Sequence, residues 1–196
     1  RCRREVIIAG IRGWPACRND CWRSQEGTRP DAEERLSGAA LQFDAAAATR
    51  LDSKLFGSLF QTVDADRRLT VLEIGSALPE TVDFFARFKC RLLFVDLFSE
   101  PFVHDQADLS ETELRHCFEE RFRFPAGTRL DLCLFWDLFN FLGRDAIAVL
   151  LDILRPHLHR DSLGHCLAVH SLKAPQSGKV YGIKALDQVS LRPRPA

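Results

Sequence analysis

The sequence predicts an α/β protein built on a mostly parallel β-sheet, and three observations lead to this fold class. Short apolar runs rich in Val, Leu and Ile alternate with segments whose apolar residues recur at helical spacing. The first of these runs, 69–74, is followed by a turn and a helix-like segment, and then by a second run, 91–96. A strand, helix, strand order of this kind is typical of parallel strands joined by a crossover helix.

The remaining elements are expected from the same patterns. Residues 1–38 mix Arg, Gly, Pro, Cys and Trp without a sustained period, so we expect an irregular leader. Residues 39–60 carry Leu and Ala at helical spacing, which predicts one amphipathic helix. Further helices are expected at 79–88, 110–122 and 145–158, and further strands at 130–136, 163–172 and, briefly, near 180–183.

Individual residues support the helix boundaries. Pro79 suits the first position of a helix, where its missing N–H costs nothing. Ser110 and Glu113 have the spacing of a capping box, in which each side chain bonds the backbone of the other residue. Between Asp96 and Asp131 there is space for one helix but little room for a further strand and helix.

Three segments are expected in the chain. The leader 1–38 precedes a core domain at 39–172, and an incomplete C-terminal segment follows at 173–196. Within that last segment, residues 192–195 are expected to be a solvated tail. The sequence contains no Met and begins with Arg, so we expect a fragment of a longer protein.

Composition excludes several classes of protein. Lys plus Arg equals Asp plus Glu at 27 each, so no global field favours nucleic acid as a partner. No apolar run is long enough to cross a bilayer, and no signal peptide is visible, which favours a cytoplasmic location. Seven cysteines without a repeated spacing argue against a disulfide scaffold. No metal site is expected, because Cys17 and Cys21 have no histidine before His104.

The most informative segment is 71–80, in which a predicted strand runs into a tight turn at Gly75 and then a helix. In sheets of this type, ligands bind beside such turns at the carboxyl ends of the strands. About 20 residues later Asp96 ends the next strand, where its carboxylate is expected to accept hydrogen bonds from ribose hydroxyls. Glu73 lies inside an apolar strand, so it either pairs with an Arg or Lys or belongs to the cofactor site.

The turn distinguishes between two classes of cofactor. A dinucleotide site requires several glycines, because the backbone must approach a pyrophosphate at the N-terminus of the helix. Here Gly75 is followed by Ala77 and Pro79, and Glu80 lies in the first helical turn. A pyrophosphate would face this carboxylate and would find no N–H on Pro79. S-adenosylmethionine carries a cationic sulfonium and no phosphate, so the turn favours it over NAD.

These residues resemble the first motifs of the class I, or Rossmann-like, S-adenosylmethionine-dependent methyltransferases. Glu73 and Gly75 match the acid and the first glycine of the first motif, whereas Ala77 and Pro79 replace its second and third glycines. Asp96 matches the acid that binds the ribose hydroxyls in that family.

The resemblance extends over roughly 69–172. The segment 130–142 is similar to the family's fourth motif, with Trp136, Asp137 and Asn140 at the matching positions. The family implies a Rossmann-like three-layer fold with a mostly parallel sheet that ends in an antiparallel pair of strands. Because the chain stops at Ala196, we expect this C-terminal pair to be truncated and the sheet edge to be open.

The resemblance also implies a set of site residues and S-adenosyl-L-methionine as the cofactor. The expected cofactor-binding residues are Glu73, Gly75, Ser76, Ala77, Asp96, Leu97, Trp136 and Asp137. Asp137 is also the candidate catalytic residue, as a base or by orienting the substrate, although methyl transfer requires chiefly proximity and alignment. Asn140 and Tyr181 are the candidate substrate-binding residues. Alternatively, Trp136 is a core residue and Asn140 caps a helix.

Three functions remain open from the sequence. The first is a methyltransferase that acts on an unidentified small molecule or protein side chain. The second is a catalytically degenerate methyltransferase-like domain that serves as a binding or structural module, a reading motivated by the replaced glycines. The third is an NAD-binding oxidoreductase. A nucleic-acid substrate is disfavoured because the balanced charge leaves no basic excess for phosphates.

Overall fold

The computed structural model describes residues 3–9, 48–61, 67–169 and 178–194. They form an α/β protein with a five-stranded main sheet in the order β1-β6-β5-β3-β4. The sheet contains β1 (Arg3–Ala9), β3 (Leu69–Glu73), β4 (Cys90–Phe94), β5 (Leu130–Trp136) and β6 (Leu158–Val169). Four strands run parallel and only β1 is antiparallel, so the predicted α/β class with a mostly parallel sheet is confirmed.

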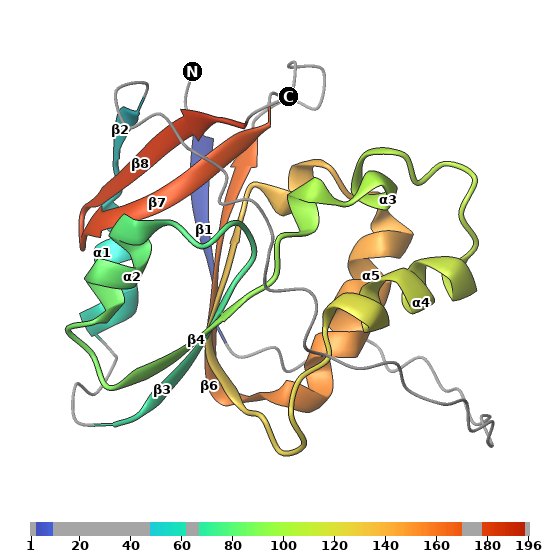
Figure 1. Cartoon of the computed structure of the whole chain (residues 1–196), viewed down its shortest axis with the longest axis horizontal. Coiled ribbons are helices and arrows are strands. Elements are labelled where there is room, and N and C mark those ends of the chain that lie inside the picture. Colours follow the sequence, from blue (N-terminus) through green and yellow to red (C-terminus); the bar gives the residue numbers. More distant parts are fainter. Residues whose placement is uncertain (1–2, 10–47, 62–66, 170–177, 195–196) are drawn as a thin grey trace, which may run out of the picture.

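Helices cover both faces of the main sheet (Figure 1). On one side lie α1 (Lys54–Gln61) and α2 (Pro79–Phe85), and on the other lie α4 (Glu111–Arg121) and α5 (Arg144–Leu154). A short helix, α3 (Pro101–His104), follows β4. Among the described residues no helix is long and apolar enough to cross a membrane.

A second sheet of three antiparallel strands lies beside the upper end of the main sheet, above α1 and α2 in the view of Figure 1. Its order is β2-β8-β7, and it contains β2 (Thr49–Asp52), β7 (Lys179–Ala185) and β8 (Gln188–Pro193). The hairpin of β7 and β8 contacts α2, where the Thr81 hydroxyl accepts a hydrogen bond of 3.1 Å from the backbone N–H of Ile183.

The core lies between the main sheet and its helices. Strand β5 is buried along almost its whole length, as expected for a central strand with both faces covered. A cluster of aromatic rings fills the space beneath α1 and α2, with Phe56, Phe60, Phe84 and Phe85 in mutual contact. Each of these side chains removes a large apolar surface from water, which is the main favourable contribution to folding.

Most of the predicted elements of the core agree with the structure to within a few residues at each end. Helix α4 begins at the predicted capping box, in which Ser110 and Glu113 bond each other's backbone N–H. The described residues 97–129 contain helices and no strand, as the short interval before Asp131 suggested. Residues 170–172 of the last predicted core strand lie outside the described residues.

The helix predicted for 39–60 is confirmed over 54–60 and is wrong over 49–52. Thr49–Asp52 is strand β2, paired with β8, and helix α1 begins only at Lys54. The physical reason is Ser53, whose hydroxyl accepts a hydrogen bond from the backbone N–H of Phe56 at 2.9 Å and caps the helix. Residues 39–47 lie outside the described residues.

The expectations of an irregular leader and an open sheet edge are also wrong for one segment. Arg3–Ala9 is strand β1, which pairs with β6 over seven residues and covers the edge that was expected to be open. Residues 10–38 lie outside the described residues. A short apolar run gives no local sign of a partner more than 150 positions away, so the pairing was not visible in the sequence.

The C-terminal segment is more ordered than predicted. The short strand expected near 180–183 is β7, and β8 follows it to form an antiparallel hairpin in the second sheet. The solvated tail predicted for 192–195 is wrong for Arg192, which is buried, and for Arg194, whose side chain is only 15% exposed. Both side chains pair with carboxylates of the main domain.

Candidate functional site

The candidate site lies where the order of the main sheet reverses. From β3 the chain first adds β4 on one side and then crosses to add β5 on the other side of β3. In open α/β sheets such a switch point creates a crevice at the carboxyl ends of the two diverging strands. Glu73 ends β3 and Trp136 ends β5, so both predicted site residues lie at this point.

Glu73 is almost completely buried, with 1% of its surface exposed. One carboxyl oxygen, Oε1, accepts a hydrogen bond from the indole N–H of Trp136, and the other has no hydrogen-bond partner among the described residues. Burial raises the pKa of Glu73 to about 8, although the bond from Trp136 lowers it in part. The acid is therefore mostly neutral at pH 7, and its partner is Trp136 rather than an Arg or Lys.

The turn after β3 connects directly to Asp96. Gly75 has φ 157°, a conformation that side chains with a Cβ rarely adopt, and its N–H donates to the carbonyl of Val95 at 3.1 Å. The next residue, Ser76, donates its hydroxyl hydrogen to Oδ2 of Asp96 at 2.6 Å. The turn and the strand-end acid, which were predicted separately, thus form one hydrogen-bonded unit.

Asp96 also forms an ion pair with Arg194, the residue that directly follows β8. Arg194 donates one N–H to each carboxylate oxygen, with N···O distances of 3.1 Å, and Ser99 donates to Oδ2 at 3.0 Å. The same guanidinium lies over the ring of Phe98, 5.2 Å from its centroid. Burial opposes ionisation of Asp96, but the hydrogen bonds and the charge of Arg194 outweigh it and hold the pKa below its ordinary value.

Trp136 stacks against the second sheet. Its ring is parallel to that of Tyr181, with a centroid separation of 5.0 Å and an interplanar angle of 5°, and Phe56 stacks at 6.2 Å. Trp136 has φ 49°, in the left-handed region that is unusual for a bulky residue. Such strain persists only where packing holds it and is common at functional sites. The structure thus places Tyr181, the predicted substrate-binding residue, against Trp136, a predicted cofactor-binding residue.

The other predicted residues are more dispersed. Asp137 follows Trp136 and is fully buried, and Leu97 is buried in the hydrophobic core. Asn140 donates from its amide to the carbonyl of Leu167 at 2.9 Å, which ties the turn after β5 to β6. Ala77 is exposed in the turn after β3.

The β7–β8 hairpin is fixed to the N-terminal turn of α2 through Glu80. Arg192 forms an ion pair with Oε1 of Glu80 at 2.6 Å, and Ser190 donates to the same oxygen at 2.8 Å. Burial opposes ionisation of Glu80, but hydrogen bonds from its own backbone, Ser190 and Arg192 lower its pKa. A carboxylate in the first turn of a helix also interacts favourably with the helix dipole.

The sequence reasoning missed these two arginines. A usable signal was present, because Ser190, Arg192 and Arg194 alternate and alternate residues of a strand face the same side. Once the segment is recognised as a strand, this spacing places the two arginines on one face rather than in a solvated tail.

No group of three or more His, Cys, Asp or Glu side chains that could hold a metal ion occurs among the described residues. Cys17 and Cys21 lie outside them. Comparison with known proteins adds no identity, since no protein family, no curated protein and no solved structure matches the chain. The function must therefore be argued from the site.

Proposed function

We propose that the chain is a Rossmann-like, S-adenosylmethionine-dependent methyltransferase domain that binds its cofactor at the carboxyl ends of β3, β4 and β5. The order β4-β3-β5-β6 supports this proposal, because it is the order of a doubly wound sheet that lacks one edge strand. The methyl acceptor in this proposal is a small molecule or a protein side chain.

The observation that carries the proposal is the way in which Asp96 binds Arg194. Two N–H groups of one guanidinium reach the two oxygens of one carboxylate, each at 3.1 Å. Two neighbouring ribose hydroxyls need the same arrangement of acceptors. Ser76, from the turn after β3, bonds the same carboxylate. We propose that Arg194 occupies the position of the ribose and that the cofactor displaces it.

Calorimetric titration of the 196-residue chain with S-adenosylmethionine and S-adenosylhomocysteine tests this proposal. Arg194→Ala removes the competing donor, so we expect it to bind either ligand about tenfold more tightly than the unaltered chain, as loss of a charged hydrogen-bonded competitor predicts. Adding Asp96→Asn to this variant should reverse the gain, because the amide accepts through one oxygen only.

The control is Arg160→Ala, which removes an exposed arginine that pairs with its neighbour Asp161. It should leave the affinity unchanged. Absence of heat with both ligands in a folded Arg194→Ala sample would contradict the proposal. NADH in the same titration tests the oxidoreductase alternative, which Pro79 disfavours because it offers no N–H to a pyrophosphate at the N-terminus of α2.

A second candidate function, a cofactor-free binding or structural module, is favoured by a different observation. The stacked rings of Trp136 and Tyr181, 1% and 3% exposed, fill the end of β5 beneath the second sheet. Ala77 and Pro79 also replace two glycines of the motif. This candidate predicts that neither Arg194→Ala nor the double substitution Ala77→Gly and Pro79→Gly binds S-adenosylmethionine.

A further inference from the structure

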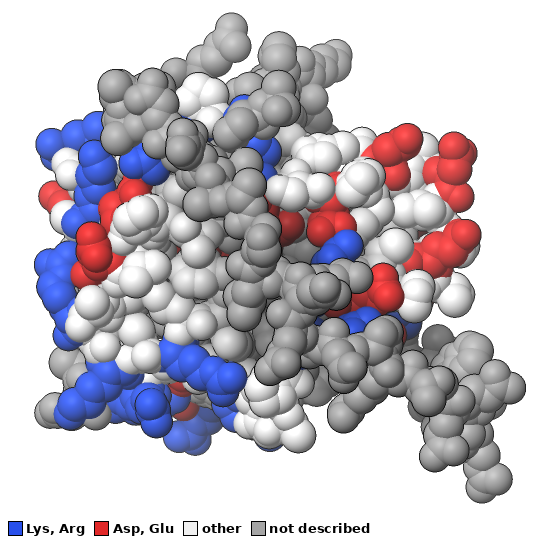
Figure 2. Space-filling model, viewed as in Figure 1, with Lys and Arg blue, Asp and Glu red and all other residues white. Residues whose placement is uncertain are grey.

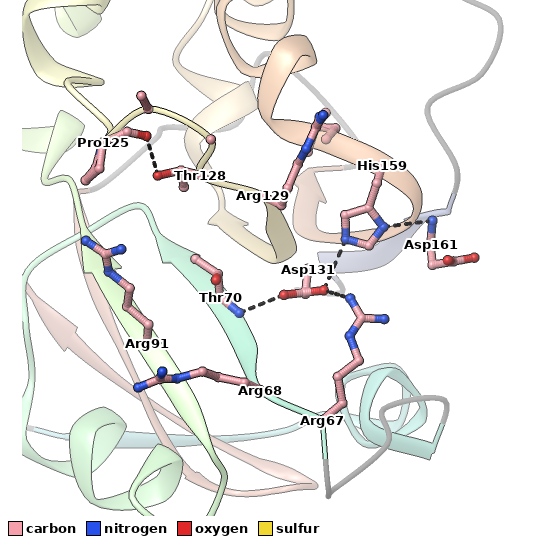
Figure 3. A pocket seen from close by; sticks show the side chains of 13 residues that line it. Arg67, Arg68, Thr70, Arg91, Pro125, Thr128, Arg129, Asp131, His159 and Asp161 are labelled. Carbon is pink, nitrogen blue, oxygen red and sulfur yellow. Dashed lines mark hydrogen bonds and ion pairs between the residues drawn. The ribbon is translucent and has the colours of Figure 1, made fainter.

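A separate pocket lies at the opposite edge of the main sheet, where its parallel strands begin. Its volume is about 840 Å³, within the usual size range of small-molecule sites. The walls come from the residues that precede β3, from the first residues of β4, β5 and β6, and from the loop 125–129 (Figure 3). Gly127 has φ 74° and is the third residue of a turn that a hydrogen bond from the N–H of Thr128 to the carbonyl of Pro125 closes.

The pocket contains more positive than negative charge. Four arginines line it against two aspartates, and Figure 2 shows Lys and Arg gathered along the corresponding lower edge of the molecule. The lining arginines are Arg67, Arg68, Arg91 and Arg129. The two aspartates are Asp131 and Asp161.

Both aspartates are already paired within the protein. Asp131 forms an ion pair with Arg67, accepts a hydrogen bond from the backbone N–H of Thr70 at 2.7 Å, and lies 3.1 Å from Nε2 of His159. Asp161 pairs at 3.3 Å with Arg160, which does not line the pocket. These two carboxylates therefore do not neutralise the charges of Arg68, Arg91 and Arg129.

Arg68 and Arg91 are both exposed, and neither makes a hydrogen bond or an ion pair with any part of the chain that the structure describes. Arg68 directly precedes β3, and Arg91 lies in the neighbouring strand β4 as the register partner of Thr70. In the view of Figure 3 both side chains lie on the side of the pocket away from Asp131. Arg129 adds a third charge, and among the described residues its guanidinium donates only to the neutral carbonyl of Pro156, at 2.9 Å.

We propose that this pocket binds a small molecule carrying two or more phosphate groups. A guanidinium presents its N–H groups in a planar fork that fits two oxygens of a phosphate, which makes arginine the preferred phosphate-binding residue. The separate forks of Arg68 and Arg91 match separate phosphoryl groups. A continuous nucleic-acid backbone fits less well, because Asp131 and Asp161 line the other part of the pocket and the whole chain has no net charge.

The test is calorimetric titration of the 196-residue chain with inorganic pyrophosphate, tripolyphosphate and orthophosphate at about 50 mM and 200 mM NaCl. We expect pyrophosphate and tripolyphosphate to bind, with weaker affinity at the higher salt concentration. Orthophosphate should bind at least about tenfold more weakly, because one phosphate group cannot occupy two arginine forks. Equal affinities for orthophosphate and pyrophosphate would contradict a site for two phosphate groups.

Substitution locates the site. The double variant Arg68→Gln and Arg91→Gln should bind pyrophosphate at least about tenfold more weakly, because two charge-assisted contacts are lost. The matched control, Arg144→Gln with Lys184→Gln, removes the same charge from exposed positions outside the pocket and should retain the affinity. Circular dichroism checks that both variants are folded. Binding that is absent, or that weakens equally in both variants, would overturn the proposal.

Discussion

The buried carboxyl group of Glu73 couples the stability of the protein to pH. Its pKa is about 8 in the folded chain, above the ordinary value of 4.5. Between these two values the unfolded chain carries a carboxylate while the folded chain keeps the neutral acid. The stabilising contribution is therefore complete below about pH 4.5 and is lost as the pH rises towards 8, by about 1.4 kcal/mol per pH unit.

Glu73→Gln should remove this dependence, because the amide cannot ionise and its oxygen still accepts the bond from Trp136. Urea unfolding at pH 5, 7 and 9 measures the free energy of unfolding. We expect the variant's profile to be flatter than that of the unaltered chain by about 1.4 kcal/mol per unit between pH 5 and 8. Glu119→Gln, at an exposed position on α4, is the control. Parallel profiles for the unaltered chain and Glu73→Gln would contradict a raised pKa.

Residue-level chemistry was partly predictable from the sequence. The distance from Gly75 to the strand-end Asp96 indicated that the turn and the acid lie together, and Ser76 joins them. The ion-pair partner of Asp96 was not predictable, because Arg194 lies 98 positions away in the sequence. Only the docking of the β7–β8 hairpin brings the two residues together. A burial-dependent property such as the pKa of Glu73 also requires the identity of its neighbours, which local patterns do not give.

At the level of elements, the β7–β8 hairpin depends on a close approach to α2. A Cβ added at Gly182 would lie 2.5 Å from Oε1 of Glu80 and 2.7 Å from the hydroxyl of Ser190. The Glu80 side chain cannot easily move away, because Arg192 and Ser190 both bind that oxygen. Glycine at this position therefore allows the ion pair between Glu80 and Arg192 to pack directly against the backbone of β7.

Gly182→Ala should separate the hairpin from α2 and lower the free energy of unfolding by about 1–3 kcal/mol, the usual cost of overpacking. Because Trp136 stacks on the neighbouring Tyr181, near-ultraviolet circular dichroism should also change. Gly178→Ala is the matched control, since its nearest contact, Cβ of Arg194, would be at 3.4 Å. The packing argument fails if the two variants unfold at the same urea concentration.

Elements with strong local signals agreed best with their predictions. Strand β5 has the predicted bounds, Leu130–Trp136, because a continuous apolar run between polar residues has few alternatives. Strand β2 was missed because Leu51 also fits the helical spacing of the residues that follow it. Only its pairing with β8 decides between the two structures, and such long-range pairing leaves no periodic pattern in a short segment.

Across the whole molecule, the two ends of the parallel strands differ in how their charges are compensated. At the carboxyl end, Glu80 is paired with Arg192 of β8 and Asp96 with Arg194, which directly follows β8. At the amino end, Arg68 and Arg91 have no such partners among the described residues. A chain with no net charge therefore presents one internally neutralised end and one cationic pocket.

The main sheet also depends on an edge strand from the start of the chain. In β1, Val6 pairs with Cys166 and Ile7 with His165 of β6. Neighbouring residues of an antiparallel strand alternate between bonding and non-bonding pairs, so one of Val6 and Ile7 donates its N–H to β6. Substituting both by proline removes that bond in either register and obstructs the pairing.

We expect Val6→Pro with Ile7→Pro to lower the free energy of unfolding by roughly 2 kcal/mol or more, as measured with urea. The exposed edge of β6 should then pair with other chains, so size-exclusion elution should shift to larger species as concentration rises. Val6→Ala with Ile7→Ala keeps both N–H groups and separates the backbone effect from the loss of side chains. If the proline and alanine variants unfold and elute alike, hydrogen bonding by β1 does not hold this edge of the sheet.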